Sequence, residues 1–168
     1  MNLKTTKLNQ DKQWTIIDLI KWSSYYLKSK SIPNSRKESE WFLSHVYNCD
    51  RLELYLKFDE IVDKKKLKLF KSFILRRLQN EPFQYIINKA PFYGRDYYVN
   101  ENILIPRPET EIIIDVMKKQ NKVDSILDIG TGSGCLAITL SLEKIANNIY
   151  AIDVFDQILE VAKENSKK

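Results

Sequence analysis

Three of the four glycines in this 168-residue chain lie close together, at Gly130, Gly132 and Gly134. A short apolar run, residues 126–129, precedes them, and a mostly apolar run that suits a helix, residues 135–142, follows them. The order of strand, glycine turn and helix is typical of cofactor sites in doubly wound sheets, where the missing Cβ atoms let a ligand approach the backbone. The pattern therefore predicts a site for a cofactor that contains a nucleoside.

An acidic residue stands where such a site needs one. Residues 148–152 are expected to form the next strand, which ends at Asp153. This acid lies about 20 residues beyond the glycines, the distance that a strand–helix–strand unit requires, and its carboxylate can accept hydrogen bonds from ribose hydroxyls. In the alternative interpretation the glycines only reverse the chain and Asp153 caps the following helix. The two roles of Asp153 do not exclude each other.

The glycine spacing separates cofactor classes. A dinucleotide site needs Gly-x-Gly-x-x-Gly and a phosphate loop ends in Gly-Lys-Ser/Thr, and neither pattern occurs here. The stretch from Asp128 to Gly134 instead resembles the first motif of class I S-adenosylmethionine-dependent methyltransferases. This resemblance implies that Asp153 binds the cofactor's ribose. It also implies that five consecutive residues line the S-adenosylmethionine: Gly130, Thr131, Gly132, Ser133 and Gly134.

Residues 1–80 are predicted to form a small helical domain. Its apolar periodicity predicts four helices, over residues 14–27, 35–48, 51–56 and 63–79. Ser35 followed by Glu38 fits a capping box at the start of the second helix. A bundle of this size can bury a core but has only marginal stability alone. Most of its aromatic side chains are expected in that core, with one or two exposed.

Residues 81–106 are predicted to be a β-hairpin linker. Two β-rich segments, residues 85–87 and 97–99, are separated by the turn-compatible Gly94, which indicates one or two short hairpins. Pro106 and Pro108 then hold the backbone extended before a helix over residues 109–117.

Residues 107–168 are predicted to be the start of an S-adenosylmethionine-binding domain. The expected fold class is α/β: a small helical bundle, a hairpin linker and the first βαβ portion of an incomplete Rossmann-like methyltransferase domain. A sheet of only two strands would have both of its edges open.

Four blocks of residues together resemble the peptide chain release factor N5-glutamine methyltransferases. They are Arg76-Arg77 with Glu81–Ile86, Phe92–Gly94 with Tyr98-Val99, Leu104–Glu111, and Ile126–Gly134. The third block, which contains Pro-Arg-Pro-Glu-Thr-Glu, is the most specific. The resemblance implies methyl transfer from S-adenosylmethionine to the glutamine side-chain amide in the Gly-Gly-Gln loop of a release factor, with the helical domain helping to dock that factor.

The chain departs from this family in two respects. Asn88 stands where the family usually has glycine, and Pro91 stands where it usually has an acid; asparagine tolerates the left-handed backbone, so the turn is expected to survive. The family's Asn-Pro-Pro-Tyr motif, which orients the glutamine amide, does not occur in the sequence and is expected beyond Lys168. We therefore assign no catalytic residue and expect no useful catalysis from this chain alone.

Two other functions stay open. A non-enzymatic module that only binds release factor would explain the missing motif. A nucleic-acid amine methyltransferase would share the glycine turn, and the net charge of +5 permits it. However, the run Lys64–Lys66 is better explained as the solvated start of a helix, and no basic stripe with interleaved aromatic residues appears. Direct binding to nucleic acid is therefore not expected.

The remaining composition excludes several classes. Cys49, Cys135 and His45 are the only cysteines and histidine, too few for a nitrogen–sulfur metal site, and the cysteines are expected to be reduced. Residues 1–13 are polar without the apolar core of a signal peptide, and no apolar run is long enough to cross a membrane. We expect no metal, no membrane contact and a cytoplasmic location.

Overall fold

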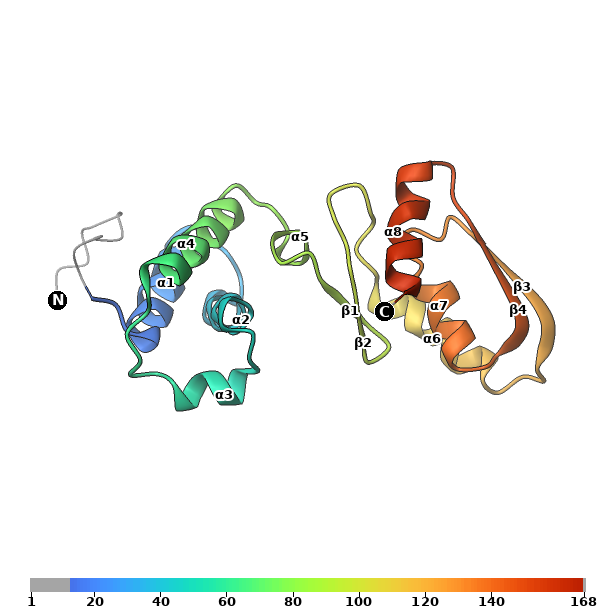
Figure 1. Cartoon of the computed structure of the whole chain (residues 1–168), viewed down its shortest axis with the longest axis horizontal. Helices are drawn as coiled ribbons and strands as arrows, with labels where there is room; N and C mark the ends of the chain where they lie inside the picture. Colours follow the sequence, from blue (N-terminus) through green and yellow to red (C-terminus); the bar gives the residue numbers. More distant parts are fainter. Residues whose placement is uncertain (1–12, 168) are drawn as a thin grey trace. The chain divides into compact units, whose positions relative to one another are not determined.

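The computed structural model describes residues 13–167 (Figure 1). The predictions that concern residues 1–12 and Lys168, the polar N-terminal stretch among them, lie outside this range. The chain divides into two compact units between Ile87 and Asn88. The first unit is helical, and the second contains all of the strands named below.

The four predicted helices are all present in the first unit. Their bounds are α1 Ile16–Ser29, α2 Ser35–Tyr47, α3 Arg51–Leu56 and α4 Lys64–Leu78. Three of them begin at a residue whose side chain accepts a hydrogen bond from the first turn: Thr15 Oγ1, Asp50 Oδ1 and Asp63 Oδ1 accept from backbone amides at 3.3, 2.7 and 2.8 Å. Each such cap contributes about 1 kcal/mol to the stability of its helix.

The capping box predicted at Ser35 and Glu38 is wrong. Helix α2 begins after Asn34, which has a left-handed backbone with φ of 53° and makes no side-chain cap. The hydroxyl of Ser35 instead donates to the carbonyl of Ile32 at 2.6 Å. The carboxylate of Glu38 is taken by Arg77 of α4, whose Nε donates to it at 2.7 Å. A tertiary ion pair therefore replaces the local cap.

Two acidic side chains of α2 hold this helix to its neighbours. The Glu38–Arg77 pair joins it to α4, and both side chains are nearly buried, at 11% and 14% exposure. The carboxylate of Glu40, which is 2% exposed, lies 2.9 Å from Arg36 Nε and 2.7 Å from Arg51 Nη2 in α3. Burial alone would raise the pKa of Glu40, but hydrogen bonds from Arg36 and Tyr55 and the charge of Arg51 hold it below its ordinary value.

The core of the first unit is apolar and partly aromatic. Its largest fully buried side chains are Ile16, Leu19, Ile20, Leu27, Phe42, Leu43, Leu54, Phe70, Ile74 and Ile86. Burying each such side chain contributes about 1.5–3 kcal/mol, which offsets much of the chain entropy lost on folding. Trp41 remains 37% exposed and stacks against Phe83, so most but not all aromatic side chains serve the core, as predicted.

The β-structure predicted over residues 85–87 is wrong. Residues Phe83–Ile86 form one helical turn, α5, which packs on the core of the first unit. The guanidinium of Arg76, which pairs with Glu81, donates to the carbonyl oxygens of Tyr85 at 3.3 Å and Ile86 at 3.1 Å. These bonds come from a residue nine and ten positions earlier in the chain, and such tertiary contacts can outweigh the β preference of the side chains.

The second unit begins with a single antiparallel hairpin. Strands β1 (Ala90–Phe92) and β2 (Arg95–Tyr97) are joined by Tyr93 and Gly94, which have φ of 49° and 72°. Two consecutive left-handed residues are typical of the tight turn that matches the twist of a hairpin. Asn88 also takes a left-handed backbone, with φ of 54°, as predicted for the residue that replaces the family's glycine.

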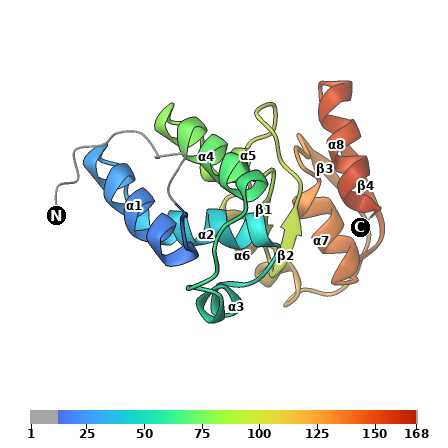
Figure 2. The same cartoon turned by 60° about the vertical axis from the view of Figure 1, so that its left-hand side comes forward.

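A parallel strand pair follows the hairpin and confirms the predicted fold class. The order is α6 (Pro108–Met117), β3 (Val123–Ile129), α7 (Cys135–Leu142), β4 (Ala146–Ile152) and α8 (Asp156–Ser166). Strands β3 and β4 are parallel, with a register that runs from Val123 opposite Ala146 to Ile129 opposite Ile152. Figures 1 and 2 show α7 crossing between the strands, which makes this a βαβ unit.

The two faces of this strand pair differ. Ile114 of α6 and Leu140 of α7 are buried against Ile126 and Ile149 of the strands, so the helices cover one face. The other face carries apolar side chains that are about half exposed or more: Leu127, Ile129, Tyr150 and Ile152. Both strands end at the same edge, which places the glycine run and Asp153 next to each other.

Candidate cofactor site

The glycine loop folds back onto the end of β4. The amides of Gly130 and Thr131 both donate to the carbonyl oxygen of Ile152, at 2.9 and 3.0 Å. The amide of Gly134 closes the loop by donating to the carbonyl of Thr131 at 2.9 Å. All three glycines have positive φ, of 77°, 56° and 77° along the chain. The loop is therefore a tight turn that side chains with a Cβ would strain.

The two non-glycine residues of the loop face the protein. Thr131 is 5% exposed and donates its hydroxyl to Asp128 Oδ2 at 2.8 Å, and Ser133 is 2% exposed. A Cβ added at Gly130 or Gly132 would meet no atom within 4 Å. The loop thus presents bare backbone outward at these two glycines, and a ligand would meet peptide groups there.

Gly134 has a different physical role. A Cβ at this position would lie 3.0 Å from Ile138 Cδ1 and 3.1 Å from Ala162 Cβ. Such contacts are shorter than packed side chains tolerate. Gly134 is therefore needed for the close approach of α8 to the loop, in addition to its left-handed backbone.

Asp153 faces the loop. Its Oδ2 accepts from the amide of Gly132 at 3.0 Å and its Oδ1 accepts from Val154 at 2.8 Å. Helix α8 begins after Phe155, with no side-chain cap, so the expectation that Asp153 caps this helix is wrong. The fold brings all six predicted site residues together: Gly130, Thr131, Gly132, Ser133, Gly134 and Asp153.

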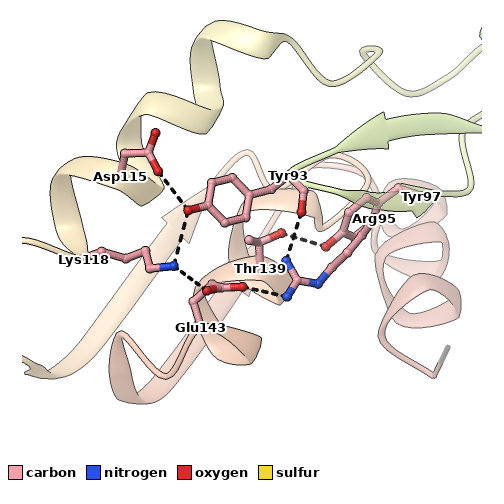
Figure 3. A network of polar contacts seen from close by, with 7 residues as sticks. All are labelled: Tyr93, Arg95, Tyr97, Asp115, Lys118, Thr139 and Glu143. Carbon is pink, nitrogen blue, oxygen red and sulfur yellow. Dashed lines mark hydrogen bonds and ion pairs between the residues drawn. The ribbon is translucent and has the colours of Figure 1, made fainter.

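A network of polar side chains, which the sequence did not reveal, fixes the hairpin to the helices α6 and α7 (Figure 3). Glu143, after α7, accepts from Arg95 Nη2 at 2.6 Å and from Lys118 Nζ at 2.8 Å. The hydroxyl of Tyr93 donates to Asp115 at 2.9 Å. A hydrogen bond of 2.8 Å also joins the hydroxyls of Tyr97 and Thr139.

The hydrogen bonds of this network favour the ionised forms of Glu143 and Lys118. Hydrogen bonds from Lys118 and Arg95 hold the pKa of Glu143 below its ordinary value. The hydrogen bond to Glu143 raises the pKa of Lys118 in turn. At neutral pH both groups are therefore ionised, and the hairpin is held to the helices by charge-assisted bonds.

The charged residues near Pro106 and Pro108 differ in their contacts and exposure. The carboxylate of Glu111 accepts from the amide of Tyr93 at 2.7 Å, so this residue holds the hairpin to α6. Arg107, which precedes α6, and Glu109 in its first turn are exposed.

Metal-binding clusters and membrane-spanning helices are both absent from the described residues. Within residues 13–167 no three His, Cys, Asp or Glu side chains gather closely enough to hold a metal ion. Over the same residues, no helix has the length and apolar character to cross a membrane. Both cysteines are free thiols, and burial raises the pKa of Cys135.

The two parts of the chain match the profiles of two different protein families. Residues 18–87 match the profile of the PrmC N-terminal domain, and residues 108–168 match that of ribosomal protein L11 methyltransferase (PrmA). A release factor glutamine methyltransferase of Chlorobaculum tepidum is 38% identical over 165 residues, which cover 94% of this chain and 56% of the relative. One of Leptospira interrogans is 36% identical over 90% of this chain and 54% of its own length.

The strand pair, its crossover helix and the glycine loop at its carboxyl edge form the first βαβ portion of a Rossmann-like methyltransferase domain. Over the portion that it spans, the chain is similar to the release factor glutamine methyltransferases. The chain spans about half the length of the curated relatives it matches.

Proposed function

We propose that this chain supplies the cofactor-binding part of a methyltransferase that modifies a glutamine side-chain amide, in the Gly-Gly-Gln loop of a release factor. The observation that carries the proposal is the contact between Asp153 and Gly132, which puts an acid at the end of β4 beside an open glycine loop. The names of the relatives support the choice of substrate.

The residues present fit S-adenosylmethionine. The outward backbone at Gly130 and Gly132 leaves room for a ligand, and Asp153 offers carboxylate oxygens to a ribose. No lysine occurs in residues 128–134, which suits a cofactor without phosphates. When bound, the cofactor supplies an activated methyl group, and the residues of this chain hold its adenosine and amino-acid portions.

The groups that orient the glutamine amide are proposed to lie outside this chain. An amide nitrogen is a poor nucleophile, so its reaction depends on hydrogen-bonding groups that position it. The Asn-Pro-Pro-Tyr motif that serves this purpose in the family is absent from the sequence. We therefore propose that the chain alone does not methylate.

A transfer assay tests this proposal. The chain is incubated with radiolabelled S-adenosylmethionine and a release factor, beside a version continued with the C-terminal part of the Chlorobaculum tepidum relative. We expect methylation by the continued version only, and its loss when the glutamine of the Gly-Gly-Gln loop is replaced. Equal methylation by both versions would show that the catalytic groups lie within residues 1–168.

The helical unit is proposed to dock the release factor. It has a hydrophobic core of its own and matches the PrmC N-terminal domain. Such a unit could also act without catalysis, as a binding module. A pull-down with residues 1–87 tests this: retention of release factor at micromolar concentration would support docking by this unit, and no retention would contradict it.

A further inference from the structure

Asn165 in α8 is a buried polar residue. Its side chain is 5% exposed and makes three hydrogen bonds. Oδ1 accepts from the amide of Tyr98 at 2.8 Å, and Nδ2 donates to the carbonyls of Tyr98 at 3.0 Å and Ser133 at 2.9 Å. Both hydrogens of the amide group and one lone pair of its oxygen are used, so the side chain is fixed in one orientation.

These bonds join segments that are distant in sequence. Tyr98, which follows β2, is 67 residues from Asn165, and Ser133 in the glycine loop is 32 residues away. Ala162, one helical turn earlier on α8, touches the site of the missing Cβ of Gly134. One face of α8 therefore packs against the glycine loop. Ala162 makes the apolar contact, at Gly134, and Asn165 makes the polar contact, at the carbonyl of Ser133.

The polar contact requires an amide. Tyr98 presents both a backbone donor and a backbone acceptor, and Ser133 presents a second acceptor, a set that only an Asn or Gln side chain can match. A carboxylate at this position would face two carbonyl oxygens without a proton to donate. An apolar side chain would leave the buried carbonyl of Ser133 and the partly buried amide and carbonyl of Tyr98 without these partners.

We infer that Asn165 is a positioning residue for the cofactor, and this inference rests on the proposed function. It orients the peptide at Ser133 with the carbonyl inward, next to the outward-facing backbone of Gly132. Through Tyr98 it also connects the glycine loop to the segment that leads to Pro106 and Pro108. Asn165 thus couples the cofactor loop to the hairpin side of the domain without touching the ligand.

The test compares Asn165→Asp and Asn165→Leu with two controls in the full chain. Asn147→Ala removes an exposed asparagine of β4 whose Nδ2 donates to Asp124 Oδ1 at 3.1 Å. Ile114→Val removes one methyl group from the buried core between α6 and the strands, away from the loop. This second control lowers stability without changing the support of the loop.

Two readouts are measured, S-adenosylhomocysteine affinity by calorimetry and amide hydrogen exchange. We expect both Asn165 variants to weaken binding about tenfold or more and to speed exchange at Gly132 and Gly134, while both controls bind as the original chain does. Unchanged exchange at the loop in both Asn165 variants would overturn the inference. So would an equal loss of affinity in Ile114→Val, since general destabilisation would then explain the effect.

Failure of the proposed function would look different. If the original chain does not bind S-adenosylhomocysteine, the cofactor assignment is contradicted, whereas hydrogen exchange still decides whether Asn165 supports the loop. If Asn165→Leu fails to fold, Asn165→Asp, which keeps the size of the side chain, decides the question through the same two readouts.

Discussion

The three glycines of the loop, all left-handed, meet different surroundings. Gly130 and Gly132 face open space, whereas Gly134 lies against Ala162 of α8. Backbone freedom is thus required at all three positions, but tight packing is required at only one. Substitutions at these positions should therefore have separable effects on binding and on stability.

Gly134→Ala should destabilise the second unit. The added methyl group would lie 3.1 Å from Ala162 Cβ, and overpacking of this kind costs about 1–3 kcal/mol beyond the backbone strain. Gly94→Ala is the matched control, because Gly94 has a similar φ of 72° and no atom within 4 Å of the added methyl. Urea unfolding should show the larger loss for Gly134→Ala, and equal losses would contradict the packing argument.

Asp153→Ala should weaken binding of S-adenosylhomocysteine. Loss of a charged hydrogen-bonding partner typically costs about 1.5–3 kcal/mol, or roughly 10–100-fold in affinity. Asp59→Ala removes an exposed carboxylate from the first unit and should bind as the original chain does. Calorimetry on both variants decides the matter; an unchanged affinity in Asp153→Ala would remove Asp153 from the site.

At the scale of elements, ion pairs and hydrogen bonds between side chains determine how helices and hairpin meet. The Glu38–Arg77 pair joins α2 to α4, and Glu143 joins the hairpin to the end of α6 and α7. The two sites differ in exposure, because Lys118 and Arg95 remain more accessible than Arg77. Their contributions to stability should differ accordingly.

Arg77→Ala should destabilise the first unit strongly. Removing one partner of a buried ion pair leaves an uncompensated charge and costs about 3–5 kcal/mol, and the slight exposure of Glu38 places this pair at the low end. Lys68→Ala, on the exposed side of α4, is the matched control and should change stability by less than about 0.5 kcal/mol. If thermal unfolding ranks the two variants equally, the pair does not hold α2 to α4.

Glu143→Gln should show a pH-dependent effect. The pKa of Glu143 is lowered in the folded chain, so its contribution to stability is fully present above its ordinary value of 4.5 and is lost as pH falls through the lower folded value. The variant should therefore melt below the original chain at pH 7, and the two melting temperatures should converge in strong acid. A difference that stays constant with pH would contradict the proposed role of the charge.

At the scale of the whole molecule, the sequence predicted what local patterns determine. The apolar periodicity of the first four helices, the apolar run before the glycines and the glycine spacing are patterns within short segments, and the elements that they predicted are present. The predictions over residues 85–87 and at Ser35 and Glu38 were wrong because these segments contact residues in other parts of the chain. Arg76 donates to the carbonyls of Tyr85 and Ile86 in the helical turn Phe83–Ile86, and Arg77 pairs with Glu38, which therefore makes no cap.

The sequence predicted residues that the fold brings together at the end of the strands, but it did not predict how they are supported. Asn165 lies three positions after Ala162 on the apolar side of α8, and a polar residue in such a stripe was the one available signal. Its partners, the backbone groups of Tyr98 and Ser133, carry no sequence signature. The glycine motif can thus be recognised from the sequence, whereas the residues that hold the motif in place are found only from the fold.

The central claim is that the glycine loop and Asp153 bind the nucleoside cofactor of a methyltransferase. The most direct measurement is a titration of the isotope-labelled chain with S-adenosylhomocysteine, followed by amide chemical shifts in NMR spectra. We predict saturable shifts centred on Gly130, Gly132 and Asp153, with the amides of α1 and α4 unchanged. No saturable shift at the loop, or shifts centred in the helical unit, would contradict the claim.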